Sequence, residues 1–209
     1  MKHLKWLIPV FIIAFCFLGF LIAPNDPEAM DIVNKYAAPS VDFPLGTDQF
    51  GRCELSRLLY GGKVTLGIVL LGGSIVLVLG TLIGLWLGQA NAAKSLAFSS
   101  LLDAVTAIPP LAYLIIFVGI WGNSIPTMLV ALTVSLILRM IKLVKTQTEL
   151  ELDKAYVLCA VSSGASRSRV LFVHILPNII RPLVHFLCLS CAEMIMNISA
   201  FSFIGLTLG

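Results

Sequence analysis

Residues 64–88 read VTLGIVLLGGSIVLVLGTLIGLWLG and contain no charged side chain. About 20 apolar residues are enough for a helix to cross the hydrocarbon core of a bilayer. The rest of the chain is also apolar, since 58% of its 209 residues are hydrophobic and only 12% are charged. A soluble domain carries about a quarter charged residues. The composition therefore predicts a membrane protein, and the net charge of +3 gives no reason to expect a nucleic-acid partner.

Glycines recur along this stretch at intervals of four or eight residues, at Gly72, Gly80, Gly84 and Gly88. Such spacing places them on one narrow stripe of a helix. We interpret Gly80, Gly84 and Gly88 as a packing face that a second helix approaches closely, as small residues do in membranes. The alternative is that glycine is simply common in membrane helices.

Four further apolar runs predict membrane helices at residues 6–23, 96–121, 126–144 and 179–204. The first is interpreted as a retained helix and not a cleaved signal peptide, because Pro24 stands where cleavage needs a small residue. Pro109 and Pro110 must kink or break the third run. The expected fold is an all-α membrane protein, a bundle of about five transmembrane helices.

The distribution of basic residues predicts the orientation. The N-terminus, the 89–95 link and residues 139–181 carry ten of the 14 Lys and Arg residues, and the 24–63 segment carries the other four. Cytoplasmic loops of membrane proteins are enriched in Lys and Arg. The N-terminus and a loop at 145–178 are therefore expected in the cytoplasm, with residues 24–63 outside.

Several ionisable or polar side chains within the apolar runs are candidates for a solute path or for the membrane interface. Asp103 either anchors the third helix at the membrane interface or lines a solute path. Glu193 and Asn197 are four residues apart on one face of the fifth helix, where they line a polar path or bond to a neighbouring helix. Arg139 and Lys142, near the predicted end of the fourth helix, are expected to snorkel toward the interface.

The loop at 145–178 has its own helical pattern. A first short helix should end at Gly164, which suits the left-handed conformation of a helix C-cap. Ser166 can cap a second short helix, and Pro177 should then mark a break. Two short helices cannot bury all of their apolar side chains, so these must lie against the membrane or a partner protein, namely Val157, Leu158 and Val161.

No catalytic or metal site is expected from the sequence. Cys188 and Cys191 form a C-x-x-C pair, but inside an apolar run they are interpreted as small buried side chains. Residues 61–64, Gly-Gly-Lys-Val, lack the glycine spacing and the Ser or Thr of a P-loop. The chain is therefore expected to be no enzyme and to bind no ATP itself.

The 145–178 loop resembles the cytoplasmic signature of ABC importer permeases. Cys159 and Ala160 take the places of two alanines, Gly164 takes that of the glycine, and residues 174–178 read HILPN like the end of that signature. Leu158 stands where the family has glutamate. The resemblance implies that the loop contacts an ATPase, through Tyr156, Leu158, Cys159, Ala160, Gly164, Ser166, Ile175, Leu176 and Pro177.

A second resemblance lies in the external segment. Residues 43–52, FPLGTDQFGR, and 55–61, LSRLLYG, are similar to a segment of the oligopeptide, dipeptide and nickel importer permeases, which usually have Asp where Cys53 stands. Asp103 followed by Pro109, and residues 202–206, also fit that family. The implied external motif consists of Gly46, Thr47, Asp48, Gly51, Arg52, Ser56, Arg57, Tyr60 and Gly61.

Together these resemblances imply a multi-pass permease subunit of an ATP-driven importer in the bacterial cytoplasmic membrane. It would have a membrane helix at 1–23, an extracytoplasmic segment at 24–63 and a permease core at 64–209. The cargo would be peptides, nickel or metal chelates. The implied partners are cytoplasmic ATP-binding subunits that use ATP and Mg²⁺, a second homologous permease, an external solute-binding protein and the lipid bilayer.

Three other functions remain open on the sequence alone. An ion-gradient-driven secondary transporter should show repeated broken helices, and a membrane enzyme should show a cluster of reactive groups. Family members also continue to a sixth membrane helix, whereas this sequence reaches Gly209 after five predicted spans. A truncated, non-transporting permease fragment is the third alternative.

Overall fold

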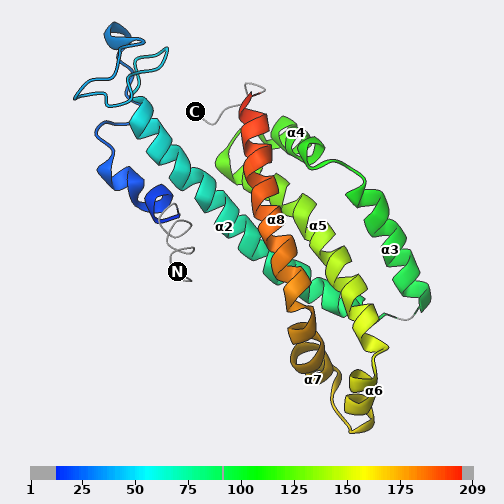
Figure 1. Ribbon diagram of the computed structural model, residues 1–209. Coiled ribbons are helices and arrows are strands. Elements are labelled where there is room, and N and C mark those ends of the chain that lie inside the picture. Colours follow the sequence, from blue (N-terminus) through cyan, green and yellow to red (C-terminus); the bar gives the residue numbers. More distant parts are fainter. Residues whose placement is uncertain (1–12, 91, 204–209) are drawn as a thin grey trace. The chain divides into compact units, whose positions relative to one another are not determined.

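A computed structural model describes residues 13–90 and 92–203, and these residues form two compact units, Met1–Ile68 and Val69–Gly209. The long helix α2 (Glu54–Leu87) begins in the first unit and ends in the second (Figure 1). Most of the described residues are helical, as the all-α fold class predicts. Three described helices are long and apolar enough to cross a membrane, and a bent helix pair could supply a fourth span.

The first unit combines a short apolar helix with an irregular loop. The helix is described over Ile13–Ile22, and its last turn, η1 (Gly19–Ile22), ends directly before Ala23 and Pro24. The earlier part of the predicted first span lies outside the described residues. The loop contains the short turn η2 (Ile32–Asn34) and leads into α2.

Helix α2 begins ten residues earlier than the hydropathy predicts, at Glu54 and not at residue 64. No proline interrupts residues 54–63, and the carboxylate of Glu54 in the first turn favours the positive end of the helix dipole. The last part of the predicted external segment is therefore helical, which includes Tyr60 and Gly61.

The second unit continues with α3 (Ala92–Thr106) and α4 (Pro110–Trp121), whose axes differ by 73° across the break between them. Pro109 is extended, with φ −62° and ψ 145°, because a residue that precedes a proline is disfavoured in the helical region. The predicted effect of the proline pair is confirmed as a break.

Helix α5 (Ile125–Leu152) starts as the sequence predicts, with Pro126 in its first turn and the Ser124 side chain accepting from the Thr127 N–H. It ends eight residues later than predicted. Polar residues 145–152 continue the helix, since a helix does not need apolar side chains once its backbone hydrogen bonds are made. The loop predicted from residue 145 is therefore shorter than expected.

The remaining elements are α6 (Ala155–Ser162), α7 (Arg167–Arg169), the π-helical segment η3 (Val170–Ile175) and α8 (Leu176–Phe203). The predicted break at Pro177 is wrong, because residues Arg167–Phe203 form one continuous helix. In η3 the Leu176 N–H bonds to the Leu171 carbonyl, five residues back. This wider turn directly precedes Pro177, which has no N–H to donate and would crowd a regular helical turn.

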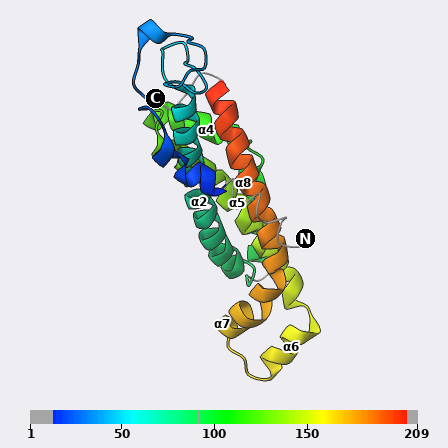
Figure 2. The ribbon, with the colours of Figure 1, turned by 60° about the vertical axis from the view of Figure 1, so that its left-hand side comes forward.

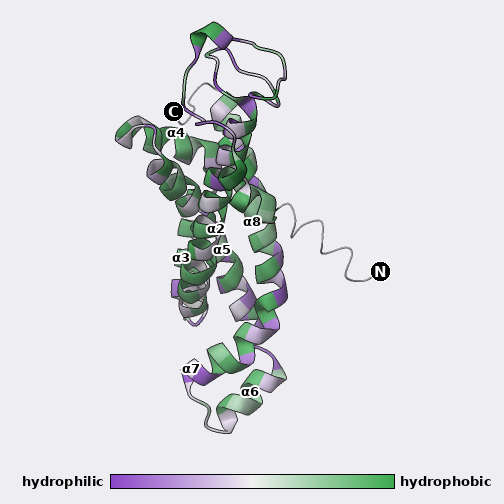
Figure 3. Ribbon diagram, turned by 90° about the vertical axis from the view of Figure 1, so that its left-hand side faces the viewer, coloured by the Kyte–Doolittle hydropathy of each residue, from purple (hydrophilic) through white to green (hydrophobic). Residues whose placement is uncertain are grey.

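The glycine stripe on α2 is confirmed as a packing face. A Cβ built on Gly80 would lie 2.5 Å from the Met140 side chain, and one on Gly88 would lie 2.6 Å from the Thr148 Cβ. Met140 and Thr148 are buried on α5. In this unit apolar residues dominate the long helices, while polar residues gather at the end of α8 next to α7 (Figure 3).

Candidate functional site

A helical arm, defined as residues 155–175, extends beyond the ends of α5 and α8 (Figure 2). Its two helical parts are joined by a turn at Gly164, whose φ is +85°. The Gly164 N–H bonds to the Val161 carbonyl and the Ala165 N–H to the Ala160 carbonyl, 2.9 and 3.0 Å away. This is the hydrogen-bond pattern of a Schellman cap. The predicted glycine cap is confirmed.

Ser166 begins the second part of the arm. Its hydroxyl accepts a hydrogen bond from the Arg169 N–H at 3.4 Å, which satisfies one of the free donors at a helix start. The predicted N-cap is therefore confirmed. Gly164 and Ser166 together reverse the chain within a few residues, so α6 and the second part of the arm lie close to each other.

Glu151 anchors the arm to the end of α5. Its buried carboxylate accepts from the Tyr156 hydroxyl at 2.6 Å and from the Lys154 ammonium at 2.7 Å. Burial, followed by the hydrogen bond to Glu151, raises the pKa of the Tyr156 phenol. Tyr156 thus remains a proton donor at neutral pH. Glu151 was not among the predicted site residues.

The predicted coupling residues divide into an exposed tip and a buried base. Leu158 and Cys159 are exposed, with 58% of Leu158 accessible, and Val161 is 55% exposed. Ile175 is fully buried. Val157 is also buried, against the expectation from sequence, because α6 packs on η3 and on the end of α5. The tip, not the whole loop, is thus available to a partner.

Two exposed apolar residues of the arm were missed by the sequence interpretation. Phe172 and Val173 are 47% and 59% exposed. A groove of about 400 Å³ lies between the end of α2 and the start of the second half of the arm. Apolar residues form most of its wall and Arg167 lies at its edge. Only the apolar run at 170–173 signalled this surface in the sequence.

A second group of polar contacts lies between the long helices. Arg139 on α5 donates through Nη1 to both carboxylate oxygens of Glu193 on α8, at 2.9 and 3.2 Å. Lys142 pairs with Asp103 on α3 at 2.5 Å. Helix α5 continues past both residues to Leu152, and each has an acidic partner on a neighbouring helix. Their snorkelling toward the interface stays a prediction. For Asn197 the described residues provide no hydrogen-bond partner.

Lys145 is among the largest fully buried side chains of the described residues. Its ammonium donates to Ser95 at 2.7 Å, Ser99 at 2.9 Å and Glu149 at 2.8 Å. These four side chains connect α3 to α5. A buried ammonium needs such acceptors around it, since it would otherwise lose its hydration without compensation. The prediction that Lys145 begins the cytoplasmic loop is wrong, because α5 continues to Leu152.

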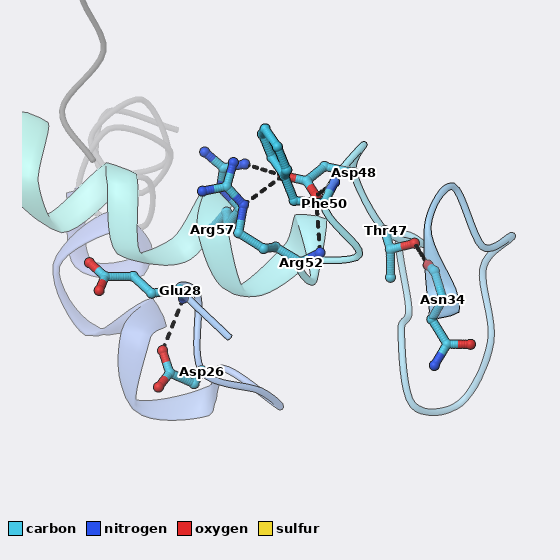
Figure 4. A network of polar contacts seen from close by, with 8 residues as sticks. All are labelled: Asp26, Glu28, Asn34, Thr47, Asp48, Phe50, Arg52 and Arg57. Carbon is cyan, nitrogen blue, oxygen red and sulfur yellow. Dashed lines mark hydrogen bonds and ion pairs between the residues drawn. The ribbon is translucent and has the colours of Figure 1, made fainter. Parts of the chain in front are cut away.

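The external motif lies in the first unit, and Asp48 organises it (Figure 4). The carboxylate accepts from the N–H groups of Phe50 and Arg52 at 2.8 and 3.0 Å, from the Arg52 guanidinium at 2.8 Å, and from Arg57. Burial alone would raise the pKa of Asp48, but these donors outweigh it and lower the pKa to about 2.

Other motif residues shape the same loop. Gly46 and Gly51 have φ of +80° and +75°, and a Cβ on Gly51 would collide with the Asp31 carbonyl. Thr47 accepts from the Ala37 N–H at 2.8 Å, and the buried Ser56 hydroxyl accepts from the Asn25 N–H at 3.1 Å. Tyr60 and Gly61 are exposed on α2 and take no part in this loop.

The described residues contain no group of three or more His, Cys, Asp or Glu side chains that could hold a metal ion. The structure therefore offers two kinds of candidate site. One is the exposed tip of the arm, which suits contact with a protein. The other is the charged pair of Arg139 and Glu193 between α5 and α8.

Comparisons with known proteins agree on one family. The sequence pattern of the binding-protein-dependent transport system inner membrane component matches residues 80–209. The peptide transport system permease protein SapC of Escherichia coli is 31% identical over 197 residues, which cover 91% of this chain and 67% of SapC.

Two further relatives are similarly close. The di/tripeptide transport system permease protein DppC of Pseudomonas aeruginosa is 31% identical over 202 residues, covering 93% of this chain and 67% of DppC. A putative peptide transport system permease protein of Brucella abortus is 31% identical over an alignment of 214 residues. The alignment covers 99% of this chain and 71% of the Brucella protein.

Proposed function

Because the chain belongs to the family of binding-protein-dependent transport system inner membrane components, we propose that it forms one half of the solute path of a peptide importer. As a permease subunit of an ABC importer it is not itself an enzyme, and ATP hydrolysis lies in separate subunits. This membership also argues against a gradient-driven transporter. Peptide is the proposed cargo because all three relatives are named as peptide permeases. None of these names supports the predicted nickel or metal-chelate cargo.

In the proposed mechanism the tip of the arm docks on a cytoplasmic ATPase subunit. The observation that carries this proposal is the exposure of Leu158 and Val161 on α6, 58% and 55%, on an element that projects beyond the helix bundle. Apolar side chains left exposed in this way mark a protein contact. The basic residues at 139–181 favour the cytoplasm for this side, and with it a cytoplasmic N-terminus.

The buried base of the arm supports a mechanical role. Val157 and Ile175 fix the arm on α5 and α8, and Glu151 ties Tyr156 to the end of α5. A force applied at the tip is therefore transmitted to two long helices and not absorbed by a loose loop. The ATPase subunits would use ATP and Mg²⁺ to apply it, a second homologous permease would complete the path, and an external binding protein would deliver the peptide.

The test is a Gly164→Val substitution in the chain co-expressed with its ATPase subunits and partner permease. Valine at φ +85° is strained, so the turn should distort and the ATPase subunits should no longer co-purify. Gly164→Asn is the matched control, since asparagine tolerates the left-handed region, and it should retain them. Leu158→Asp should weaken the complex without any backbone strain.

Each outcome has a clear meaning for docking. If Gly164→Val and Leu158→Asp both keep the ATPase subunits at the wild-type level, the arm is not the docking element. If the wild-type chain assembles with its partners but the reconstituted complex imports no peptide, the proposed cargo is wrong. Loss of the ATPase in both variants, with Gly164→Asn unaffected, supports the proposal.

A further inference from the structure

Arg139 and Glu193 form an ion pair between two long helices, near the middle of α5 and in the second half of α8. Arg139 is 14 residues from the start of α5 and 13 from its end, or about 20 Å from either at 1.5 Å per residue. Glu193 lies 17 residues into α8, with ten residues after it. A charged pair on apolar helices is costly wherever it faces lipid, so it is expected to face protein or water.

The pair is not enclosed by the chain's own helices. The side chain of Arg139 is 32% exposed and that of Glu193 is 35% exposed. By contrast Met140, the next residue on α5, and Met194, the next on α8, are fully buried. The charged face of this helix pair therefore points away from the packed interior of the unit, toward an aqueous path or another subunit.

The pair also leaves hydrogen-bonding groups unused. Among the described residues, the Glu193 carboxylate accepts hydrogen bonds only from Nη1 of Arg139, while a guanidinium carries five N–H donors on three nitrogens. Within the described part of the chain, Nε and Nη2 of Arg139 have no acceptor. Asn197 lies one turn from Glu193 on α8, and its amide is also without a partner among those residues. Unsatisfied polar groups inside a membrane are expensive, so a transient partner is expected for them.

These observations lead to a specific role in cargo recognition. We propose that Arg139, Glu193 and Asn197 line the solute path and bind the charged ends and backbone of a passing peptide. The free edge of the Arg139 guanidinium binds the peptide carboxylate, since Arg matches carboxylates through paired N–H donors. Glu193 binds the peptide ammonium, and the Asn197 amide bonds to a peptide group.

The inference rests on the proposed peptide cargo, and it explains why an ion pair is placed here. In the empty path the two side chains neutralise each other, which limits the cost of charge in the membrane. A zwitterionic peptide adds a second partner to each side chain, so binding leaves no charge unpaired. The peptide can also leave, because the Arg139–Glu193 pair keeps both charges neutralised without it.

The experiment uses the complete importer in proteoliposomes and a charge-swapped variant, Arg139→Glu with Glu193→Arg. The swap keeps an ion pair between α5 and α8, so assembly with the ATPase and thermal stability should stay near the wild-type values. Import of trialanine with free ends should fall by about tenfold or more, as expected for the loss of one charged hydrogen bond in transit. Asn197→Leu should reduce import by a smaller factor.

A matched control uses the pair between α5 and α3, Lys142 and Asp103, whose side chains are 49% and 56% exposed. Lys142→Asp with Asp103→Lys is also a reversed ion pair, here between α5 and α3. It should leave trialanine import within about twofold of wild type, the size of effect expected for an exposed pair. Import of trialanine with an acetylated amino end and an amidated carboxyl end should differ little between the wild type and the Arg139–Glu193 swap.

The results separate the inference from the proposed function. If the Arg139–Glu193 swap assembles and imports trialanine at the wild-type rate, the pair only joins two helices and the inference is overturned. It is also overturned if both swaps lower import equally, or if the blocked peptide is affected as much as the free one. If wild-type importer moves no trialanine at all, it is the peptide cargo that fails.

Discussion

Gly84 on α2 packs so closely against Val144 on α5 that a Cβ on Gly84 would lie 2.5 Å from the Val144 Cβ. The same contact recurs one turn away in each direction, at Gly80 with Met140 and at Gly88 with Thr148. The three glycines on α2 and the three residues that they contact on α5 are both spaced by four residues. The two helices therefore keep the same register over at least two turns. Small residues at this spacing allow such close approach in membranes.

We expect Gly84→Leu to destabilise the helix bundle, because neither backbone can move apart without losing the neighbouring glycine contacts. Inserting side-chain atoms into a packed interior costs about 1 to 3 kcal/mol. Thermal unfolding of the detergent-purified protein would report this as a lower midpoint. Gly84→Ala should also lower the midpoint, because its Cβ alone would lie 2.5 Å from the Val144 Cβ.

Gly119→Ala is the matched control for this prediction. A Cβ on Gly119 meets nothing within 4 Å, so the substitution should be neutral or slightly stabilising, since alanine favours a helix over glycine by about 1 kcal/mol. Equal losses at Gly84 and Gly119 would show that glycine matters here for helix flexibility and not for close packing.

The stripe of glycines could be predicted from the sequence, but its partner helix could not. Spacing by fours fixes which residues share one face of a helix, and it carries no information about which other helix covers that face. Val144 and Thr148 carry no local signal that they oppose glycine. The partner depends on contacts between residues about 60 positions apart, and only the folded chain shows them.

The ends of the helices, and the partners of the charged residues near those ends, were predicted least well. Hydropathy marks where a helix meets lipid, so it missed the polar turns at Glu54 and at residues 145–152. This one error had further effects. With α5 predicted to end near residue 144, Arg139 was expected near the end of the helix and Lys145 in a loop, whereas both lie within a long helix with partners on its neighbours.

Lys145→Met should destabilise the contact between α3 and α5. The substitution keeps most of the buried stem but removes three donors, which leaves Ser95, Ser99 and Glu149 without their shared partner. Loss of a charged hydrogen bond costs about 2 kcal/mol. Chemical or thermal unfolding in detergent should show the loss.

Lys142→Met provides the comparison, since the Lys142 side chain is 49% exposed and pairs with Asp103 alone among the residues that the structure describes. An exposed pair contributes at most about 1 kcal/mol. Lys142→Met should therefore lower stability less than Lys145→Met does. The reverse order would mean that the burial of Lys145 is not what stabilises this contact.

The lowered pKa of Asp48 predicts that the external loop is sensitive to acid. Its pKa in the folded loop, about 2, lies below the ordinary value of 3.8. A lowered folded-state pKa contributes stability that is fully present above pH 4 and is lost as the pH falls from about 4 to 2. The shift corresponds to about 2 kcal/mol. Protease sensitivity of the loop should rise across this interval, and Asp48→Asn should make it high already at pH 7.

Asp42→Asn is a suitable control for the pH experiment, because Asp42 is exposed and its carboxylate has no hydrogen-bond donor among the described residues. Its substitution should leave proteolysis at pH 7 unchanged. If Asp48→Asn behaves in the same way as Asp42→Asn, the four donors around Asp48 do not hold the loop in place.

Tyr156→Phe should loosen the arm where it joins α5. The change removes only the hydroxyl that donates to the buried Glu151 carboxylate at 2.6 Å, and a hydrogen bond to a charged group contributes about 1.5 to 3 kcal/mol. Hydrogen exchange of the α6 amides should therefore become faster. Tyr60→Phe is the control, because Tyr60 is 43% exposed and no described residue bonds to its hydroxyl.

The same bond has a pH dependence of known sign. The pKa of Tyr156 is raised above its ordinary value of 10.0, through burial first and the neighbouring carboxylate second. A raised folded-state pKa gives stability that is complete below pH 10 and is lost only as the pH rises further. After correction for intrinsic rates, exchange in α6 should stay constant from pH 7 to 9 in the wild type. A difference between Tyr156→Phe and wild type that vanished within this range would show that the phenol is not the anchor.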